Sequence, residues 1–579
     1  MTEFFVSPEG NDRGRGTHDK PFATVARAQR AVRKLIAAGL REDVTVHIGG
    51  GRYELDRPLV FGSQDGGTAK RRVAYAGVKG EQAVLSGGSR ITGWRKGKGG
   101  VWRATIADVK AGKWYFRQLF IDGCRAVRAR MPNEGEYLHL IDADFDAEFT
   151  EHLLTFRPGV LKKWRNIEDV EAVMYSHWVV TRKRLTAVDT KHNVAHTQAP
   201  HFTGIQRPRP NAPTYLENAL EFLDAPGEWY LDRKTGVLTY RPRQGEDMRT
   251  AEVVAPRLEQ LLRIEGKAGK PVRNLHFRGL RFEHARWQMP PEGHRPIQAG
   301  FVFPATAAAP QNQWNKGLWY DDFACVPTPP AIEWAYAHGC SFAGGAVAHT
   351  GATGLHLREG CRRNTIEGNE IDDAGCNGIY IGEYWRNVYD HGRDRDIKAT
   401  MVPTGNRVAN NHVHHCAVQL EDGVGIGYSF AAGTEIVHNH LHDLPYTGVS
   451  AGFIWTSKPT CVRDNRIEQN HIHDVMLRMA DGGAIYTLGY QPGSTMRHNL
   501  LHDIPRHPEA IGAPNNGIFM DEGSRGFRIE GNVIYHSAGT PVRHNENLRA
   551  WQAWKDNVFV ESGEPEPAVL SKLSAGIES

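Results

Sequence analysis

Acidic residues stand at the ends of short apolar segments in the second half of the chain. Asp481 opens the segment DGGAIYTLG, and Asp521 and Glu522 close the segment NGIFMDEG. Two carboxyl groups held close together can serve as a general acid and a general base. Aspartate beside glycine also suits a tight turn, so an ordinary turn is the alternative at both places.

Histidines recur at fixed positions after a repeated asparagine, three residues after it in one set and one residue after it in another. A metal site brings different ligands to a single point, whereas these residues would form columns that rise one layer at a time. The spacing therefore favours a stacked ladder, and we predict no metal ligands. The first set is His414, His442, His473 and His502, and the second is His412, His440 and His471.

The repeat is the strongest structural signal in the sequence. Six segments share the pattern asparagine, any residue, aliphatic, polar, polar, and they are separated by 42, 28, 31, 29 and 33 residues. These lengths suit one coil of a solenoid, for which we expect two strands a coil and a column of buried asparagines. The asparagines are Asn369, Asn411, Asn439, Asn470, Asn499 and Asn532.

The rest of the chain predicts how this solenoid is completed. Residues 23–40 form an amphipathic pattern typical of a helix, which would cap the first coil. The repeat is lost between about residues 95 and 265, where Glu228 to Tyr240 reads as a hairpin with its turn at Asp232 to Gly236. We predict an all-β protein, a right-handed parallel β-helix with an N-terminal capping helix and an inserted β-sandwich. The divisions are 1–94 (cap and first coils), 95–265 (insertion) and 266–579 (main β-helix with the active site).

Composition excludes several classes of partner. The 70 basic and 66 acidic side chains nearly balance, which gives no reason to expect nucleic acid. No apolar run approaches the roughly 18 residues needed to span a membrane. The seven scattered cysteines lack metal-type spacing. The N-terminus enters a strand-like segment with no room for a signal peptide, so we expect a cytoplasmic protein, or a periplasmic or secreted one if a leader has been removed.

Several segments together resemble glycoside hydrolase family 141. They are the opening FFVSPEGNDRGRGTHDKPFATVARAQRAVR, the segment FRQLFIDGCRAVRARMP, and the motifs DGGAIYTLG and NGIFMDEG, so the likeness extends over nearly the whole chain. The resemblance implies a parallel β-helix with an inserted β-sandwich and an activity on α-L-fucosides or xylan. The opening signature is also similar to that of the β-xylosidases of family 120.

The resemblance also implies the catalytic residues. Asp481 and Asp521 match the pair of aspartates proposed for family 141, and Asp521 also matches the nucleophile strand of family 120. The second carboxylate of family 120 would fall on Asn545, with Glu546 beside it as a substitute. If both strands were straight, Asp481 and Asp521 would lie up to about 20 Å apart at roughly 3.3 Å per residue. The segments 475–481 and 507–515 could fold inward and close that gap.

Sugar sites pair aromatic platforms with polar side chains. Asp422 stands at the same offset after Asn411 as Asp481 does after Asn470, so it could bind sugar or calcium, although a structural turn is favoured. Arg543 and His544, on the coil after Asp521, could contact a hydroxyl-rich or anionic ligand. The aromatic candidates, of which we expect about two to touch substrate, are Trp287, Trp314, Trp319, Trp385, Trp455 and Tyr486.

These observations favour a glycoside hydrolase that binds an oligo- or polysaccharide of plant or algal origin. The activity that the resemblance implies first is that of an exo-acting α-L-fucosidase, and the alternative is a xylan-acting hydrolase or β-xylosidase. A calcium-assisted polysaccharide lyase is a further reading, as is a β-helix that binds without catalysis. We expect that the protein requires no cofactor, although it could bind a structural calcium ion. The sequence does not indicate the oligomeric state.

Overall fold

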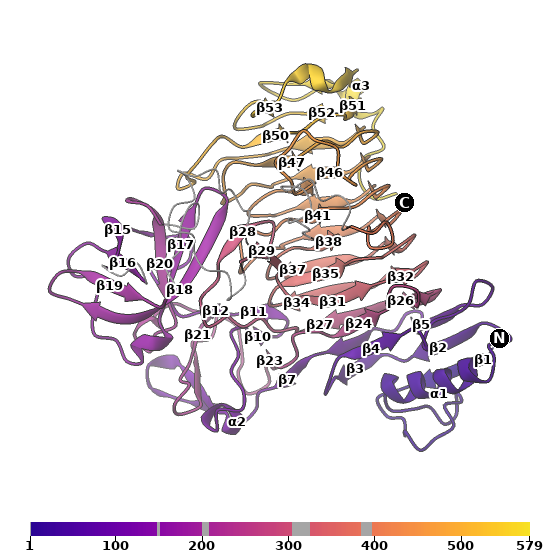
Figure 1. Cartoon of the computed structure of the whole chain (residues 1–579). Coiled ribbons are helices and arrows are strands. Elements are labelled where there is room, and N and C mark those ends of the chain that lie inside the picture. The colour runs from indigo at the N-terminus through magenta and orange to yellow at the C-terminus, as the bar shows by residue number, and fades with distance from the viewer. Residues whose placement is uncertain (1, 147–150, 200–207, 304–324, 384–396, 579) are drawn as a thin grey trace.

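The computed structural model describes residues 2–146, 151–199, 208–303, 325–383 and 397–578. Three long parallel sheets run side by side through most of the chain and form a β-helix (Figure 1). The twelve-stranded sheet runs from β1 (Thr2–Val6) to β54 (Ala553–Lys555). The eleven-stranded sheet runs from β3 (Gly51–Glu54) to β55 (Val558–Phe559), and the ten-stranded sheet runs from β4 (Leu59–Gly62) to β53 (Val542–His544).

Each coil contributes one strand to each sheet, so a coil has three strands, and the expectation of two strands was wrong. One complete coil consists of β45 (Arg466–Glu468), β46 (His471–His473) and β47 (Gly483–Thr487). The strand that the sequence did not reveal ends two residues before the repeated asparagine. It has only three residues and a single inward side chain, Ile467, which is too short a segment to display a period.

The predicted asparagine column is confirmed at the turn between the twelve- and eleven-stranded sheets. The backbone N–H of Asn470 donates to Oδ1 of Asn499 at 3.0 Å, and its side-chain amide donates to the carbonyl of Ile436 at 2.9 Å. The same contacts repeat from Asn369 up to Asn557. Buried polar groups are tolerated here because each finds its partners in the neighbouring coil.

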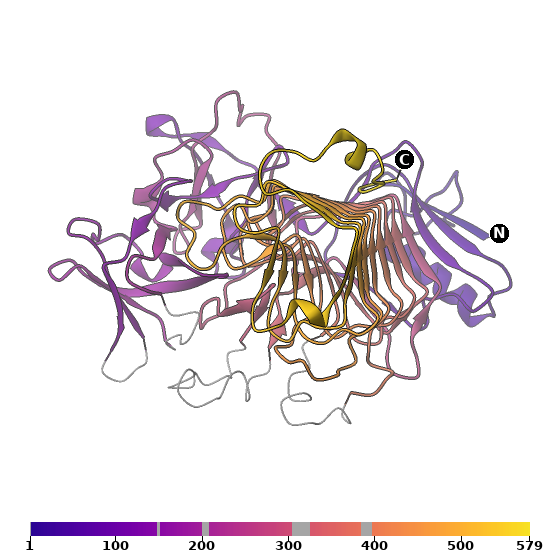
Figure 2. The same cartoon turned by 90° about the horizontal axis from the view of Figure 1, so that it is seen from above.

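The first coil is covered by α1 (Val25–Ala37), as the amphipathic pattern predicted. The side chain of Thr24 caps this helix by accepting a hydrogen bond from the backbone N–H of Arg27 at 3.1 Å. Val25, Ala28 and Val32 are buried against the first strands. Viewed along the axis in Figure 2, the stacked coils enclose a continuous apolar interior between three flat walls. Among the described residues, no helix is long and apolar enough to cross a membrane.

The chain leaves the β-helix after β6 (Ala83–Ser86) and returns at β24 (Leu262–Glu265). Between them it forms three further sheets of four, five and eight strands, which lie to one side of the β-helix in Figure 1. The predicted hairpin is present as β21 (Glu228–Leu231) and β22 (Val237–Tyr240), which pair antiparallel. Two buried apolar clusters show that this insertion has its own core.

Two short elements lie between the insertion and the ten-stranded sheet. The first is the turn between β17 (Glu171–Ser176) and β18 (Val179–Asp189) of the insertion. The second is β28 (Pro296–Gln298) with β29 (Phe301–Val302) and β30 (Val326–Pro327). Trp178 joins them, because its indole N–H donates to the carbonyl of Ile297 at 3.0 Å. Phe301 packs on Tyr380 of the sheet, with ring centroids 5.1 Å apart. These elements bring the insertion to the upper coils of this sheet.

Candidate active site

Asp521 directly follows β50 (Asn516–Met520) of the ten-stranded sheet and is 9% exposed. Its Oδ2 accepts a hydrogen bond from the hydroxyl of Tyr486, and its Oδ1 accepts one from the amide of Asn545 at 2.7 Å. Burial raises the pKa of Asp521, and the hydrogen bonds from Tyr486 and Asn545 oppose that rise. The carboxyl is thus held in one orientation by two donors from neighbouring coils.

Asp481 lies before β47, in the left-handed region with φ 59°. Its Oδ1 is 3.0 Å from Nη1 of Arg543, which comes from β53. The guanidinium of Arg543 also lies over the ring of Phe519, 4.3 Å from its centroid. Burial raises the pKa of Asp481, while the charge and hydrogen bond of Arg543 lower it.

The two aspartates stand at opposite ends of adjacent strands, as the repeat predicted. In the strand register Tyr486 pairs with Phe519, and Phe519 pairs with Arg543, so these three side chains form a row between the aspartates. The charge of Asp481 is among the causes that raise the pKa of Asp521, so the electrostatic fields of the two groups overlap. The site is therefore one connected cluster over the upper coils.

The two segments that could fold inward, 475–481 and 507–515, meet beside Asp481. The backbone N–H of Asp481 donates to the carbonyl of Ala513 at 3.2 Å, which joins the 475–481 segment to the 507–515 segment. Next to it, the backbone N–H of Ala480 donates to the carbonyl of His177 at 3.2 Å. His177 forms part of the β17–β18 turn, so the insertion borders the site. The sequence offered no signal for this contact, because about 300 residues separate the two segments.

Two glutamates extend the carboxyl cluster beyond Asp521. Burial together with the charges of Asp521 and Glu546 raises the pKa of Glu522 to about 7. A carboxyl group with such a pKa still holds a proton near neutral pH, as a general acid must. Glu522 was not among the predicted site residues, although it stands beside Asp521 in the motif MDEG.

The aromatic candidates divide into three groups. Tyr486 is only 3% exposed, so its ring is no open platform and its hydroxyl serves Asp521 instead. Trp287 is also buried, in a cluster with Met289 and Leu420. Trp455 is half-buried and packs on the cluster that contains Tyr486, so it is the one described candidate at the border of the site. The remaining candidates, Trp314, Trp319 and Trp385, lie outside the described residues.

The other predicted binding residues lie in different surroundings. Asp422 is fully buried, with Oδ1 3.4 Å from Nε2 of His294, and it is not part of the cluster around Asp521. His544 follows Arg543 on the same strand, so its side chain points to the opposite face, where Nδ1 lies 2.7 Å from Oδ1 of Asn547.

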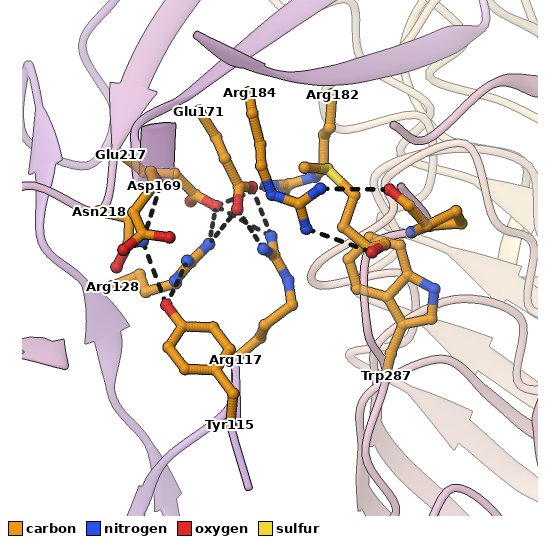
Figure 3. A network of polar contacts seen from close by, with 12 residues as sticks. Tyr115, Arg117, Arg128, Asp169, Glu171, Arg182, Arg184, Glu217, Asn218 and Trp287 are labelled. Atoms are coloured by element: carbon orange, nitrogen blue, oxygen red, sulfur yellow. Dashed lines mark hydrogen bonds and ion pairs between the residues drawn. The ribbon is translucent and has the colours of Figure 1, made fainter. Parts of the chain in front are cut away.

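A buried network of charges fixes the insertion against the β-helix (Figure 3). Glu171 and Glu217 lie at its centre and accept hydrogen bonds from the arginines around them. Arg182 also donates to the carbonyl of Gln419 in the β-helix at 2.6 Å, and Arg117 lies over the ring of Trp287. Moving the insertion away from the β-helix would leave buried charges of this network unpaired, which is costly. The network therefore fixes the position of the insertion relative to the β-helix.

Comparison with known proteins gives two family matches within the chain. Residues 99–243 match the GH141 insertion domain, and residues 331–545 match the right-handed β-helix region, which confirms the handedness of the coils. No curated protein is significantly similar to the chain.

Among solved structures, one described as "Glycoside hydrolase" is 26% identical, covers 100% of this chain and 99% of its own, and has a TM-score of 0.88. A second, described as "The complex structure of XylC with xylose", is 14% identical, covers 92% of this chain and 75% of its own, and has a TM-score of 0.50. The second likeness shows the fold alone. The insertion domain, the β-helix and the full-length relative together identify this chain as a glycoside hydrolase that carries a GH141-type insertion domain.

Proposed function

We propose that this chain is an exo-acting glycosidase that releases α-L-fucose from plant or algal glycans, with Asp521 and Asp481 as its catalytic carboxyl groups. The observation that carries the proposal is the nearly buried carboxyl of Asp521, oriented by Tyr486 and Asn545 within the field of Asp481. Glycoside hydrolysis requires two carboxyl groups at the scissile bond. The choice of an α-L-fucoside rests on the resemblance of the motifs around these aspartates to family 141.

In the proposed reaction Asp521 acts as the carboxylate, either attacking the anomeric carbon or removing a proton from water. Hydrogen bonds from Tyr486 and Asn545 favour the ionised form of a carboxyl group, which suits both roles. Asp481 is the proposed acid, which protonates the departing glycosidic oxygen. If Asp521 attacks, Asp481 then removes a proton from the water that hydrolyses the glycosyl ester and frees Asp521; if Asp521 activates water instead, hydrolysis is complete in one step. Neither route needs a cofactor.

Glu522 is the strongest rival to Asp481 as the acid. Arg543 favours the ionised form of Asp481, whereas no cation is among the causes that shift the pKa of Glu522. With a pKa of about 7, Glu522 would be protonated in roughly half of the molecules at neutral pH. Substitution of each carboxyl group separately decides between them.

The lyase reading is less well supported by the described residues. A calcium site for a lyase would depend on the acidic pair Glu421 and Asp422, which are adjacent in the sequence. Asp422 is fully buried, and burial raises the pKa of Glu421, whose carboxyl accepts a hydrogen bond from Tyr175 at 2.7 Å. A carboxyl group that favours its neutral form is a poor ligand for calcium.

A panel of nitrophenyl glycosides tests the proposal. We expect release of nitrophenol from the α-L-fucoside, with no loss of rate after treatment with a chelator. Faster turnover of the β-D-xyloside would replace the fucosidase proposal by the xylosidase alternative. Release of an unsaturated, ultraviolet-absorbing product from a uronate polymer would indicate a lyase, and no turnover of any glycoside or polymer would favour a binding protein.

A further inference from the structure

Seven histidines cover part of the outer face of the eleven-stranded sheet, on a different wall from Asp521. They belong to β40 (His412–His414), β43 (His440–His442), β46 and β49 (Leu500–His502). Their rings stack in two columns, as the repeat predicted. The first column is His412, His440 and His471, and the second column is His414, His442, His473 and His502. His442 and His473, for example, have centroids 5.1 Å apart and planes inclined by 9°. If the rings only stacked, the columns would have a structural role and no binding role.

Ring nitrogens of the two columns nevertheless converge. Nε2 of each first-column histidine meets Nε2 of the second-column histidine one coil further on. These distances are 2.7 Å for His412 and His442, 2.8 Å for His440 and His473, and 2.7 Å for His471 and His502. These contacts join the two columns, so they cannot be predicted from the spacing of the histidines within either column.

An aspartate supports each of these second-column histidines from behind. Asp443, Asp474 and Asp503 directly follow them in the chain, and their carboxylates lie 2.6, 2.7 and 2.7 Å from the Nδ1 atoms. All three aspartates have a positive φ, of 52°, 46° and 48°, a conformation in which Asp is enriched among non-glycine residues. An Nδ1–H bound to carboxylate leaves the lone pair of Nε2 directed at the partner ring. Metal-binding histidines commonly have this carboxylate support.

Three imidazole nitrogens gather at two places along the ladder. His412, His440 and His442 each offer one nitrogen within 4.8 Å of the others, and so do His440, His471 and His473. Burial and the neighbouring imidazoles lower the pKa of His412 and of His440 to about 4. All five side chains are partly exposed, which leaves them accessible from solvent.

We propose that this ladder binds a divalent transition-metal ion such as zinc through three imidazole nitrogens. The two sites share His440, so each chain should bind one ion tightly. Zinc bonds to histidine are about 2.0–2.1 Å long, so in a tetrahedral site the paired nitrogens must separate to roughly 3.3 Å by small side-chain rotations. The proton between each pair then moves to Nδ1 of the first-column ring. Nitrogen ligands favour zinc, nickel or copper over calcium or magnesium.

The test uses the full chain without a histidine tag, stripped with a chelator and titrated with zinc in a calorimeter. Cobalt serves as a spectroscopic probe, because a tetrahedral cobalt site absorbs strongly in the visible. We expect one zinc per chain, a higher Tm with zinc, and loss of both in His440→Gln. Asp443→Asn, Asp474→Asn and the double variant should bind more weakly, by about 10- to 100-fold in the double variant.

His276→Gln is the matched control, because His276 is a partly buried histidine on the twelve-stranded sheet with its own partners, Ser341 and Asn274. It should bind zinc normally. Circular dichroism checks folding, and His473→Gln with His412→Gln replaces His440→Gln if that variant does not fold. Absence of binding, or binding unchanged in the ladder variants, would overturn the proposal. Glycosidase activity should be unaffected throughout, which separates this test from that of the proposed function.

Discussion

The hydroxyl of Tyr486 donates a hydrogen bond to Oδ2 of Asp521 across two neighbouring coils of the ten-stranded sheet. Tyr486 is the fourth residue of its five-residue strand, whereas Asp521 directly follows the end of the next strand. The bond therefore connects the carboxyl group to a side chain of the sheet. The stacking of the coils thus orients the carboxyl group that we propose to be catalytic. The substitution Tyr486→Phe, which removes only the hydroxyl group, tests the role of this hydrogen bond.

Tyr486→Phe should shift the pH dependence of turnover. The hydrogen bond lowers the pKa of Asp521, so its loss raises that pKa further and leaves less of the ionised form at a given acidic pH. The acidic limb of the kcat profile should therefore move to higher pH. Tyr535→Phe is the control, since Tyr535 stacks on His502 on another wall. An unmoved acidic limb would mean that Asp521 does not titrate in that limb.

Asp521→Asn and Asp481→Asn should each lower kcat by about 10²- to 10⁴-fold or more, because each removes a proposed proton-transfer group or nucleophile. Both variants should keep the Tm of the parent within a few degrees. Azide should restore turnover of an activated nitrophenyl glycoside only where the nucleophile is missing. Asp556→Asn, at an exposed position of the last coil, is the control. Near-normal turnover in Asp521→Asn would remove the proposed site.

The identity of the acid can be decided with Glu522→Gln and Glu546→Gln beside Asp481→Asn. If Asp481 is the acid, both glutamine variants should keep most of the activity on a substrate with a poor leaving group. If Glu522 is the acid, its pKa of about 7 should set the basic limb of the profile, and Glu522→Gln should abolish that limb. Collapse in Glu546→Gln alone would make Glu546 the partner of Asp521.

Asn470→Ala should destabilise the β-helix by about 3 kcal/mol, because it leaves buried backbone and amide groups without partners. Urea denaturation followed by circular dichroism measures the loss. Asn557→Ala, at the half-buried end of the same column, should cost less than half as much. Equal losses at both positions would show that the ladder does not stabilise the coils through burial.

Glu171→Gln should destabilise the chain by about 3–5 kcal/mol, because it leaves Arg117 and Arg128 with too little negative charge in a buried site. Burial alone would raise the pKa of Glu171, but these two arginines lower it well below its usual value of 4.5. The ionised group therefore stabilises the fold above about pH 4.5, and this stability is lost as the pH falls through the lower, folded pKa. Urea unfolding between pH 3 and 7 should show a shallower acid decline in Glu171→Gln.

The sequence by itself determined the architecture of this protein. A buried asparagine and an aliphatic residue recur in successive coils from Asn369 to Asn532, so many copies of one weak signal point to the same stack. The insertion appears as a stretch without that signal. The hairpin at Asp232 was equally local, since its turn and its alternating strands lie within a few residues of each other. What repeats or is local can be inferred from a linear chain.

Only the tertiary structure decided the details of the site. Several contacts depend on how coils of unequal length lie against each other. They are the contacts between Arg543 and Asp481, between the insertion and the turn before β47, and between the two histidine columns. The raised pKa of Glu522 and the burial of Tyr486 arise in the same way, from neighbours supplied by other coils. The direction of a side chain and its electrostatic environment depend on the groups that surround it in the folded protein. The number of residues between two such groups in the sequence does not determine the distance between them in space.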